Sequence, residues 1–439
     1  MNMNDAAIKV IRILNEHGHD AFLVGGCVRN FLMNINPADY DIATSANVDE
    51  VKSMFDYRVI GSGEKHGTVL VLTDGEDVHI EVTSYRNAAL TLEEDLSHRD
   101  FTINAIAYHP DKGIIDIYGG AEDIKNKIIR GIIDPRERFH EDPLRILRAL
   151  RFASVFGFRI ENETSTEIHN LRFTFESISP ERIENELTKI ICGHDAERIL
   201  EEYSDVIFAL IPELECTKGF NQHNVHHYLD VYSHTLKVLG AVANTPVMRW
   251  TALFHDIAKP ECFFTDDNGH GHFYGHDLRG AEIAGVVMER LRFDNRRKSM
   301  IEFMIKYHCV HFPENKKVMR RYLSKFGHDN YVMLLEFQKA DLLGHVFNAE
   351  IMKAYDYAVE LLHEVEAEDS CLSLKDLAIN GHDVLRLGLK GRDVGHALSY
   401  VLESVIDERV NNNRDELLEF LGRYVNDIMR KNSHERADE

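Results

Sequence analysis

Two aspartates, Asp39 and Asp41, are the residues of this chain whose type and spacing most clearly indicate a chemical role. On an extended backbone, residues two apart point to the same side, so the two carboxylates converge. Neighbouring carboxylates repel each other, and a bound cation removes this repulsion. A pair of divalent ions about 3.5–4 Å apart would also clamp an in-line displacement at phosphorus. The spacing therefore predicts a site for divalent cations, although an isolated Asp-x-Asp pair is also common on solvated loops.

Two glycines separate the apolar residues 21–24 from a following arginine, Arg29. Between a strand and a helix, Gly25 and Gly26 would let the backbone approach a phosphate, while helix N–H groups and Arg29 supply positive charge. A glycine pair alone can be no more than a turn. The combination of strand, glycines, arginine and aspartates within residues 21–41 favours a nucleotide-phosphate site.

The motif Gly25-Gly26-x-Val28-Arg29 followed by Asp39-x-Asp41 resembles the nucleotide-binding motif of one family. This family comprises the class II tRNA nucleotidyltransferases and bacterial poly(A) polymerases of the polymerase-β-like superfamily. Further motifs of that family follow in the family's order. They are Gly63-Glu64-Lys65-His66-Gly67-Thr68, Arg99-Asp100-Phe101-Thr102-Ile103-Asn104-Ala105, Asp116-Ile117-Tyr118-Gly119-Gly120, Glu141-Asp142-Pro143-Leu144-Arg145 and Glu181-Arg182-Ile183-Glu184-Asn185-Glu186-Leu187. The resemblance implies nucleotide transfer from CTP or ATP to the 3′ end of tRNA with release of pyrophosphate. Asp39 and Asp41 would be the catalytic Mg²⁺ ligands.

Charged residues recur every third position after these motifs, as Asp142, Arg145, Arg148 and Arg151. On a helix this spacing places each beside the next, in one broad stripe. Arginine forks and aspartate oxygens suit the Watson–Crick edge of a base. By resemblance, Asp142 and Arg145 read the base, and Arg148 and Arg151 support the nucleotide or its phosphates. A solvated helix face is the alternative, above all for Arg151.

The resemblance also implies contacts to the rest of the nucleotide. Arg29 and Arg99 would hold the triphosphate, and Asp100 would hold the ribose. His98 stands where the family often has a second arginine, which argues against a two-arginine clamp. The implied nucleotide-binding set is completed by Gly25, Gly26 and Asn104.

Charge is distributed unevenly along the 439 residues. The chain has 50 Lys and Arg against 73 Asp and Glu, a formal net charge of −23. Residues 125–159 instead hold nine basic and four acidic residues, a net charge of +5, so the remainder sums to −28. The basic stretch adjoins the predicted site, where a triphosphate and an RNA end would bind, and the acidic remainder would repel RNA elsewhere.

A short connection bears on the product. Only six residues, 87–92, separate Tyr85-Arg86 from Glu93-Glu94. Family members that add the full C-C-A sequence usually carry a longer charged loop here, whereas relatives that add only two cytidines have it trimmed. We therefore expect a CC-adding enzyme, with a separate enzyme adding the terminal A. The alternative is complete CCA addition, with another segment replacing the loop.

A second set of possible metal ligands lies further along the chain: His234, His255, Asp256, His276, His308 and Asp341. Imidazoles with carboxylates form a mixed nitrogen and oxygen site for a divalent metal, whose bound water becomes a nucleophile. Their order resembles the HD metal-dependent phosphohydrolases. The resemblance implies phosphodiesterase or phosphatase activity on nucleotides or damaged RNA ends. The metal's identity stays open. Surface or supporting positions are expected for His223, His226, His227, His270 and His272.

The elements that must position these residues form an α/β head and a long helical remainder. Residues 67–72 and 78–83 are rich in β-branched side chains and flank Asp74-Gly75, a hairpin signal. Beyond residue 123 helical periodicity dominates. We expect a nucleotidyltransferase head with a small mixed sheet and helices (1–125) and a helical neck that carries the base-reading helix (126–195). A helical body with the HD domain (196–370) and a helical, tRNA-binding tail (371–439) should follow.

Composition excludes several classes of protein. The apolar share of 44% is too high for a disordered chain. No apolar run approaches the roughly 18 residues of a membrane span, and no signal peptide is visible. The six cysteines include no Cys-x-x-Cys pair, which excludes a thiolate zinc ribbon and fits a cytoplasmic protein.

Two rival functions stay open at this point. A poly(A) polymerase shares the head motifs but usually carries a basic tail for arbitrary RNA. An HD phosphodiesterase or phosphatase whose head only binds RNA would not incorporate CTP. The intact Asp39 and Asp41 pair argues against this hydrolase.

Overall fold

The computed structural model describes residues 4–55, 59–63, 67–72, 79–86, 91–223, 228–368 and 370–435. Contacts divide the chain into two compact units. The first comprises Met1–Phe220, Ala243–Leu253 and Glu282–Met300, and the second comprises Asn221–Val242, Phe254–Ala281 and Ile301–Glu439. The four-part division expected from the sequence is finer than these units and stays a prediction.

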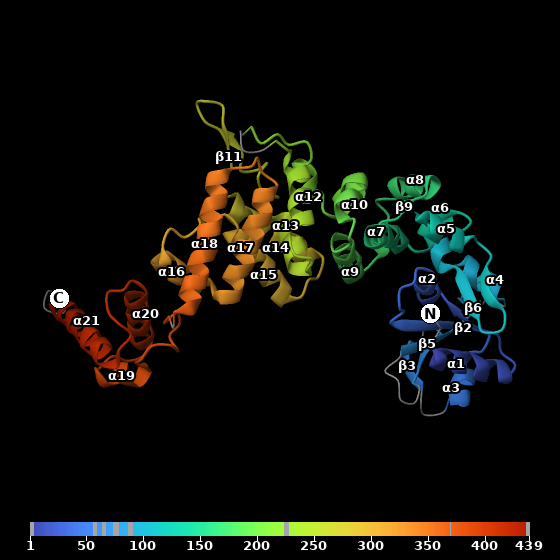
Figure 1. The fold of residues 1–439 in the computed structure, drawn as a ribbon, viewed down its shortest axis with the longest axis horizontal. Helices are drawn as coiled ribbons and strands as arrows, with labels where there is room; N and C mark the ends of the chain where they lie inside the picture. The colour runs from blue at the N-terminus through green and yellow to red at the C-terminus, as the bar shows by residue number, and fades with distance from the viewer. Residues whose placement is uncertain are drawn as a thin grey trace. The chain divides into compact units, whose positions relative to one another are not determined.

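A mixed seven-stranded sheet organises the N-terminal part of the first unit (Figure 1). Its order is β3-β4-β5-β2-β1-β6-β7, with β2 and β5 parallel and all other neighbours antiparallel. Strand β1 is buried along its whole length, as its unbroken apolar sequence predicts. The strands are β1 (Ala21–Val24), β2 (Asp39–Thr44), β3 (Val59–Gly63), β4 (Thr68–Val71), β5 (His79–Ser84), β6 (Ile106–His109) and β7 (Gly113–Asp116).

Short helices accompany this sheet. Helix α1 starts after Asn4, whose side chain accepts hydrogen bonds from the N–H groups of Ala6 and Ala7. Its buried residues at positions 7, 10, 11 and 14 have helical spacing, so one face packs on the sheet. The helices are α1 (Asp5–Glu16), α2 (Gly26–Leu32), α3 (Val48–Phe55), α4 (Leu92–Ser97) and the 3₁₀ turn Thr102–Asn104.

The rest of the first unit is helical, with one two-stranded parallel pair. Helix α7 packs against α9 and buries Ile146, Leu147 and Leu150, which leaves its arginines on the other face. The elements are α5 (Gly120–Asn126), β8 (Ile128–Ile129), α6 (Pro135–Glu141), α7 (Leu144–Phe156), β9 (Arg159–Ile160), α8 (Asn162–Asn170), α9 (Pro180–Ile191), α10 (Ala196–Glu202), α11 (Ser204–Leu210), α13 (Pro246–Phe254) and the 3₁₀ turns Phe175–Ser177 and Pro212–Thr217.

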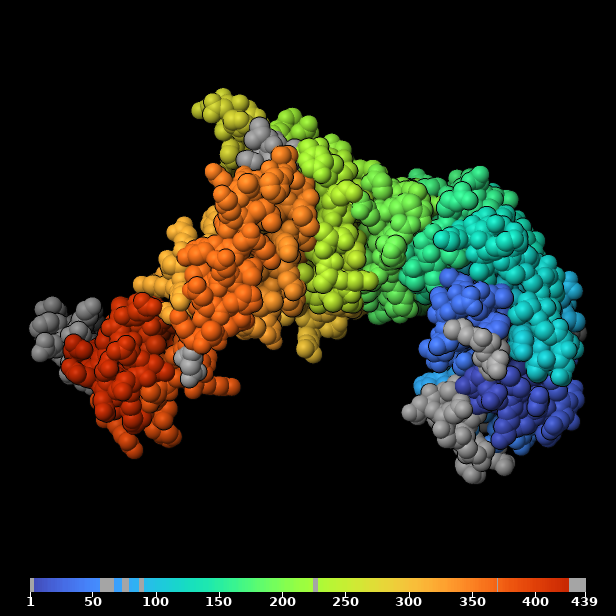
Figure 2. Space-filling model, in the orientation of Figure 1, coloured from blue at the N-terminus to red at the C-terminus, as the bar shows by residue number. Residues whose placement is uncertain are grey.

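The second unit is helical. Helix α12 packs against α17, while the hairpin of β10 and β11 stands out from the surface (Figure 2). The last three helices share an apolar cluster of their own. The elements are α12 (Val231–Ala241), β10 (Phe264–Thr265), β11 (Gly271–His272), α14 (His276–Arg290), α15 (Asn295–Tyr307), α16 (Lys316–Phe326), α17 (His328–Leu343), α18 (Ala349–Ala367), α19 (Gly381–Arg386), α20 (Arg392–Ile406) and α21 (Arg414–Glu435), of which α14 and α15 extend across both units.

The expected fold class, an α/β head followed by helices, is confirmed. Strands β4 and β5 form the predicted antiparallel pair, whereas Asp74-Gly75 lies outside the described residues. Beyond residue 126 the described strands are two residues long, so helical periodicity is a correct guide there. None of the described helices combines the length and the apolar character that crossing a membrane requires.

Candidate active site and metal centre

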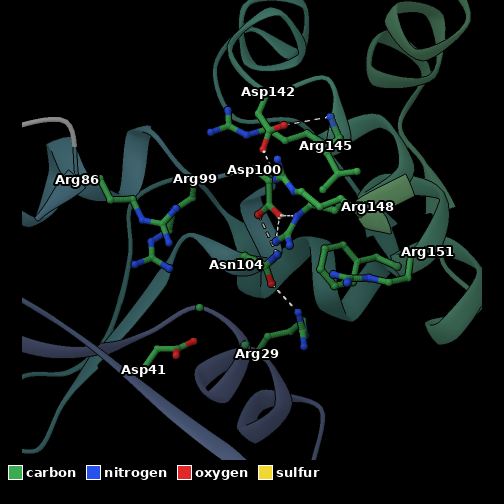
Figure 3. A pocket seen from close by; sticks show the side chains of 15 residues that line it. Arg29, Asp41, Arg86, Arg99, Asp100, Asn104, Asp142, Arg145, Arg148 and Arg151 are labelled. Atoms are coloured by element: carbon green, nitrogen blue, oxygen red, sulfur yellow. Dashed lines mark hydrogen bonds and ion pairs between the residues drawn. The ribbon is translucent and has the colours of Figure 1, made fainter. Parts of the chain in front are cut away.

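A pocket of about 420 Å³ lies in the first unit, within the size range of small-molecule sites (Figure 3). All the predicted nucleotide-binding residues line it, together with Asp41. Asp39 is exposed and is not among the lining residues that the structure describes. The lining residues are Gly25, Gly26, Arg29, Asp41, Arg86, Arg99, Asp100, Asn104, Asp142, Leu144, Arg145, Arg148, Arg151, Phe152 and Arg182.

Asp41 reaches the pocket from strand β2. Tyr40 and Ile42 are buried, so Asp39 and Asp41 share the opposite side of the strand, as alternation predicts. Burial raises the pKa of Asp41, and the Asp39 carboxylate raises it further against the opposing charge of Arg99. The pair is therefore a place where negative charge is only partly compensated.

A third carboxylate, Glu81, lies beside this pair and was missed from the sequence. Strand β5 runs parallel to β2 with Glu81 in register with Asp41. Burial raises the pKa of Glu81, and the carboxylates of Asp41 and Asp39 raise it further. Its one sequence signal is an acidic residue in an alternating strand. All three side chains supply oxygen donors of the kind that Mg²⁺ prefers. In the described residues, however, their oxygens are not among the groups of donor atoms that already lie close enough together to hold an ion.

The turn between β1 and α2 requires glycine at position 25. Gly25 has a φ of +72°, where other side chains are strained. A Cβ atom there would lie 2.9 Å from Arg99 Nη1 and 3.8 Å from Asp41 Oδ2. The missing side chain thus lets Arg99 and Asp41 approach the backbone of the turn.

Four pocket residues form a continuous hydrogen-bonded chain (Figure 3). Arg29 Nη1 donates to Asn104 Oδ1 (2.6 Å), and Asn104 Nδ2 donates to Asp100 Oδ1 (2.9 Å). Arg148 Nε donates to Asp100 Oδ2 (2.8 Å). Although burial alone would raise the pKa of Asp100, Arg148 and Asn104 bring it down to about 2. Burial lowers the pKa of Arg29 to about 10. The chain connects α2 to α7 across the pocket.

The predicted helical stripe is divided in the structure. Helix α7 begins at Leu144, and Asp142 precedes it in an extended conformation (φ −146°, ψ 98°). The expectation that Asp142 shares a helix with the arginines is wrong, because a proline, here Pro143, disfavours helical backbone in the preceding residue. Asp142 Oδ1 instead accepts the N–H of Leu144 (3.1 Å), and Oδ2 lies 3.4 Å from Arg182 Nη2. Asp142 still faces the same pocket.

The remaining α7 arginines are held by protein groups. Arg145 Nη1 donates to Glu141 Oε2 (3.0 Å), and Arg145 Nη2 donates to the carbonyl of His98 (3.0 Å). Arg151 Nη1 donates to Glu186 Oε1 (2.9 Å). These contacts fix the direction of each guanidinium. Glu186 and Arg182, both in the quoted 181–187 motif, were not assigned to the site from the sequence.

A second pocket, of about 540 Å³, adjoins the first over β4 and β5. The two pockets share Asp41, Arg86, Arg99 and Arg145. Arg99 Nη2 donates to Asp95 Oδ2 (3.0 Å), which leaves Arg99 between the two spaces. His98, the departure from the family pattern, lines the second pocket.

In the second unit, three predicted metal ligands converge in one buried cluster. His234 Nε2 lies 3.0 Å from Asp341 Oδ1, and His255 Nε2 lies 3.6 Å from the same oxygen. The two Nε2 atoms are 3.3 Å apart. The side chains approach from α12, from the residues after α13 and from α17. Three donor atoms within this distance match the geometry of a bound ion.

Asp256 lies between this cluster and the two other predicted ligands. Its Oδ2 is 3.2 Å from His255 Nε2, while Oδ1 is 3.4 Å from His276 Nε2 and 3.9 Å from His308 Nε2. Oδ2 is buried and lies 2.7 Å from Lys259 Nζ, which forms an ion pair with it. Asp256 thus contacts His255 through one oxygen and His276 through the other, and its carboxylate would be among the groups that hold a metal ion. Lys259 was missed, and its signal is the spacing three residues after Asp256.

Charge couples these groups strongly. Burial would raise the pKa of Asp256, but His255 and Lys259 hold it well below the usual range. Burial would lower the pKa of His255, but Asp256 and Asp341 raise it to about 10. Metal binding would replace this proton, because only the neutral imidazole is a ligand.

Among the histidines expected at surface or supporting positions, the described ones belong to neither group of donor atoms that could hold an ion. His270 Nδ1 and His272 Nε2 are 3.6 Å and 3.1 Å from Asp266 Oδ2 in the exposed hairpin. His223 is exposed beside Phe263. His226 and His227 lie outside the described residues.

Three family models match parts of the chain. Residues 21–130 match a poly A polymerase head domain, and residues 280–421 match tRNA nucleotidyltransferase domain 2. Residues 157–215 match a "Probable RNA and SrmB- binding site of polymerase A".

Two relatives and one solved structure that resemble this chain share the name CCA-adding enzyme. The CCA-adding enzyme of Bacillus licheniformis is 38% identical over 267 residues, which cover 56% of this chain and 67% of the relative. The CCA-adding enzyme of Lactobacillus helveticus is 28% identical over 434 residues, covering 94% of this chain and 96% of the relative. The crystal structure of the Bacillus stearothermophilus CCA-adding enzyme with CTP has a TM-score of 0.70 at 25% identity, covering 99% of this chain and all of that one. This chain belongs to the CCA-adding enzyme family of tRNA nucleotidyltransferases.

Proposed function

We propose that this chain transfers nucleotides from CTP or ATP to the 3′ end of tRNA and releases pyrophosphate. One observation carries the proposal: Asp41 and the α7 arginines face the same pocket of about 420 Å³. A transferase needs a carboxylate near the reacting phosphate and fixed cations around the rest of the nucleotide. tRNA as substrate and a cytoplasmic place of action are parts of the proposal.

Each side of the pocket has its own task in this proposal. Asp39 and Asp41 orient the attacking 3′ hydroxyl, with Glu81 beside them. Arg29 and Arg99 hold the triphosphate as pyrophosphate departs. A divalent cation bound to the carboxylates would neutralise charge between the attacking oxygen and the α-phosphate.

Base selection falls to the opposite side. Asp142 presents acceptor oxygens and Arg145 presents donors, and both are held by neighbouring groups. Arg148 and Arg151 support the nucleotide from α7. The second pocket shares Asp41 and extends over β4 and β5, which gives the RNA end its own approach to the carboxylates.

Incubation of the full chain with tRNA that lacks its 3′ end tests this function. Each nucleoside triphosphate is supplied singly, and the products are sequenced. Incorporation of C from CTP is expected. Long tails from ATP alone would favour the poly(A) polymerase, and no incorporation would favour the RNA-binding hydrolase.

The length of the added sequence is a separate proposal. The connection formed by residues 87–92 is only six residues long, and its last residue, Leu92, is already the first residue of α4. Residues 87–90 themselves lie outside the described part. We expect products that end in -CC when CTP and ATP are both supplied, with a separate enzyme adding A. Products that end in -CCA would refute this expectation.

A second activity is favoured by the buried cluster around Asp256. We propose that this region is a metal-dependent phosphohydrolase. Its metal ions would be held by the six ligands assigned from the sequence. A bound divalent ion would activate a water molecule. Hydrolysis of 2′,3′-cyclic phosphates is expected, with loss in His255→Ala but unchanged CTP incorporation. Hydrolysis that survives His255→Ala would exclude this centre.

A further inference from the structure

A cysteine, Cys309, lies beside two of the predicted metal ligands, His276 and His308. Cys309 Sγ lies 3.1 Å from His308 Nε2 and 3.6 Å from His276 Nε2. In the described residues, these three side chains form one of two groups able to hold a metal ion; His234, His255 and Asp341 form the other. The two groups therefore differ in one donor, since a sulfur stands where the other has a carboxylate.

The histidines beside Cys309 have a fixed orientation. His276 Nδ1 lies 2.7 Å from the carbonyl of Phe273, and His308 Nδ1 lies 2.6 Å from that of Ile305. A carbonyl only accepts, so each Nδ1 carries the proton and each Nε2 keeps its lone pair. Hydrogen bonds of this kind are typical of histidines that bind metals. Both lone pairs are thus available on the side of Cys309.

The backbone around Cys309 is also held in place. Gln338 Nε2 donates to the carbonyls of His308 (2.9 Å) and Val310 (2.6 Å), on either side of the cysteine. Gln338 is almost completely buried on α17. The position of Sγ relative to the histidines therefore follows from a packed contact and not from a free loop.

The distances agree with coordination. A tetrahedral zinc site, with Zn–S of about 2.3 Å and Zn–N of about 2.0 Å, separates sulfur from nitrogen by about 3.5 Å. Cys309 Sγ is close to this distance from both Nε2 atoms. Asp256 Oδ1 is the neighbouring carboxylate oxygen, 3.4 Å from His276 Nε2 and 3.9 Å from His308 Nε2. A thiol proton could satisfy only one of the two imidazoles, whereas a metal ion satisfies both.

We propose that Cys309 is a thiolate ligand of the second metal position, together with His276, His308 and Asp256. This inference rests on the metal centre proposed above. A soft sulfur donor selects Zn²⁺ or Co²⁺ over Mg²⁺, while the position of His234, His255 and Asp341 has the mixed nitrogen and oxygen set that accepts harder ions. The two positions would thus hold different metals when both kinds are present.

Cobalt titration of the metal-free full-length chain tests the proposal. Thiolate coordination produces a sulfur-to-cobalt charge-transfer band in the near ultraviolet, and any bound Co²⁺ gives visible d–d absorption. We expect both in the wild-type chain. Cys309→Ser should lose the charge-transfer band and keep d–d absorption from the other position. Cys216→Ser is the matched control, because Cys216 is also exposed and should leave both signals unchanged.

The other ligands separate the two positions. His276→Ala should lose the charge-transfer band, and His234→Ala should retain it. A band that persists in Cys309→Ser, or d–d absorption without the band in the wild type, would overturn the cysteine assignment and leave the metal centre standing. Absence of any cobalt absorption in the wild type would overturn both. Circular dichroism of each variant confirms that folding is intact.

Discussion

The nucleotide pocket and the metal centre differ in how their charges are compensated. In the pocket, Arg148 and Arg151 are paired with Asp100 and Glu186, while the Asp41 carboxylate has a raised pKa. In the metal centre, Asp256 and Asp341 have pKa values held far below the usual range by histidines and Lys259. The pocket is open and the cluster is tight, as a nucleotide and an ion respectively require.

The difference shows what each site still lacks. Buried carboxylates with raised pKa values attract a cation. The carboxylates of the pocket would therefore be compensated by a cation that binds from solution. The centre already balances the charge of Asp256 with the imidazole of His255 and the ammonium of Lys259, and a bound metal would displace the His255 proton. Nucleotide transfer in the pocket should therefore be most sensitive to substitution of its carboxylates. Metal binding in the centre should be most sensitive to substitution of its ligand residues.

The largest expected effect is loss of transfer in Asp41→Asn. Removing one carboxylate charge should lower CTP incorporation by about 10³-fold or more, because metal-held charge supplies several kcal/mol to such reactions. Incorporation into trimmed tRNA measures it. Asp111→Asn, an exposed aspartate of the same unit, is the control and should stay fully active. Equal activity in both variants would end the assignment of Asp41.

A smaller effect is expected for Asp142→Ala. Losing one charged hydrogen-bond acceptor for the base should lower kcat/KM for CTP by about 10- to 100-fold, since such bonds contribute about 1.5–3 kcal/mol. Competition between CTP and UTP measures the accompanying loss of base discrimination. Unchanged discrimination would show that Asp142 serves only as the cap of Leu144.

Asp100→Asn should lower the free energy of unfolding by about 2 kcal/mol at neutral pH, because the pKa of Asp100 is depressed to about 2. A depressed pKa stabilises the fold above the ordinary value near 3.8, and this stability is lost as the pH falls towards 2. Urea unfolding of both proteins at several pH values measures the difference. A difference that grows as the pH falls would contradict the pairing with Arg148.

The smallest effect on stability is expected for Gly25→Ala, at about 1 kcal/mol. Gly18→Ala is the matched control: Gly18 has a φ of +86° and no atom within 4 Å of the added Cβ, whereas the Cβ at Gly25 meets Arg99 Nη1 at 2.9 Å. Both variants should lose similar stability, but Gly25→Ala alone should lose CTP incorporation. Full activity in Gly25→Ala would mean that Arg99 can move freely.

Local sequence determined a large part of this protein. The alternation in residues 39–44 placed Asp39 and Asp41 on one side of a strand, and the glycine pair marked the turn before α2, because backbone geometry follows from neighbouring residues. The change from strand to helical periodicity near residue 125 correctly predicts that the described strands beyond it are only two residues long. A recognisable motif order supplied the family.

The tertiary structure decided which distant groups meet. Glu81 joins Asp41 only through the register of two parallel strands, and Asp256 bridges two groups only because several helices converge on it. Cys309 became a candidate ligand through its distance from His276. Periodicity assigns a side chain to a face of its own element, but which other element covers that face depends on packing between segments far apart in the chain.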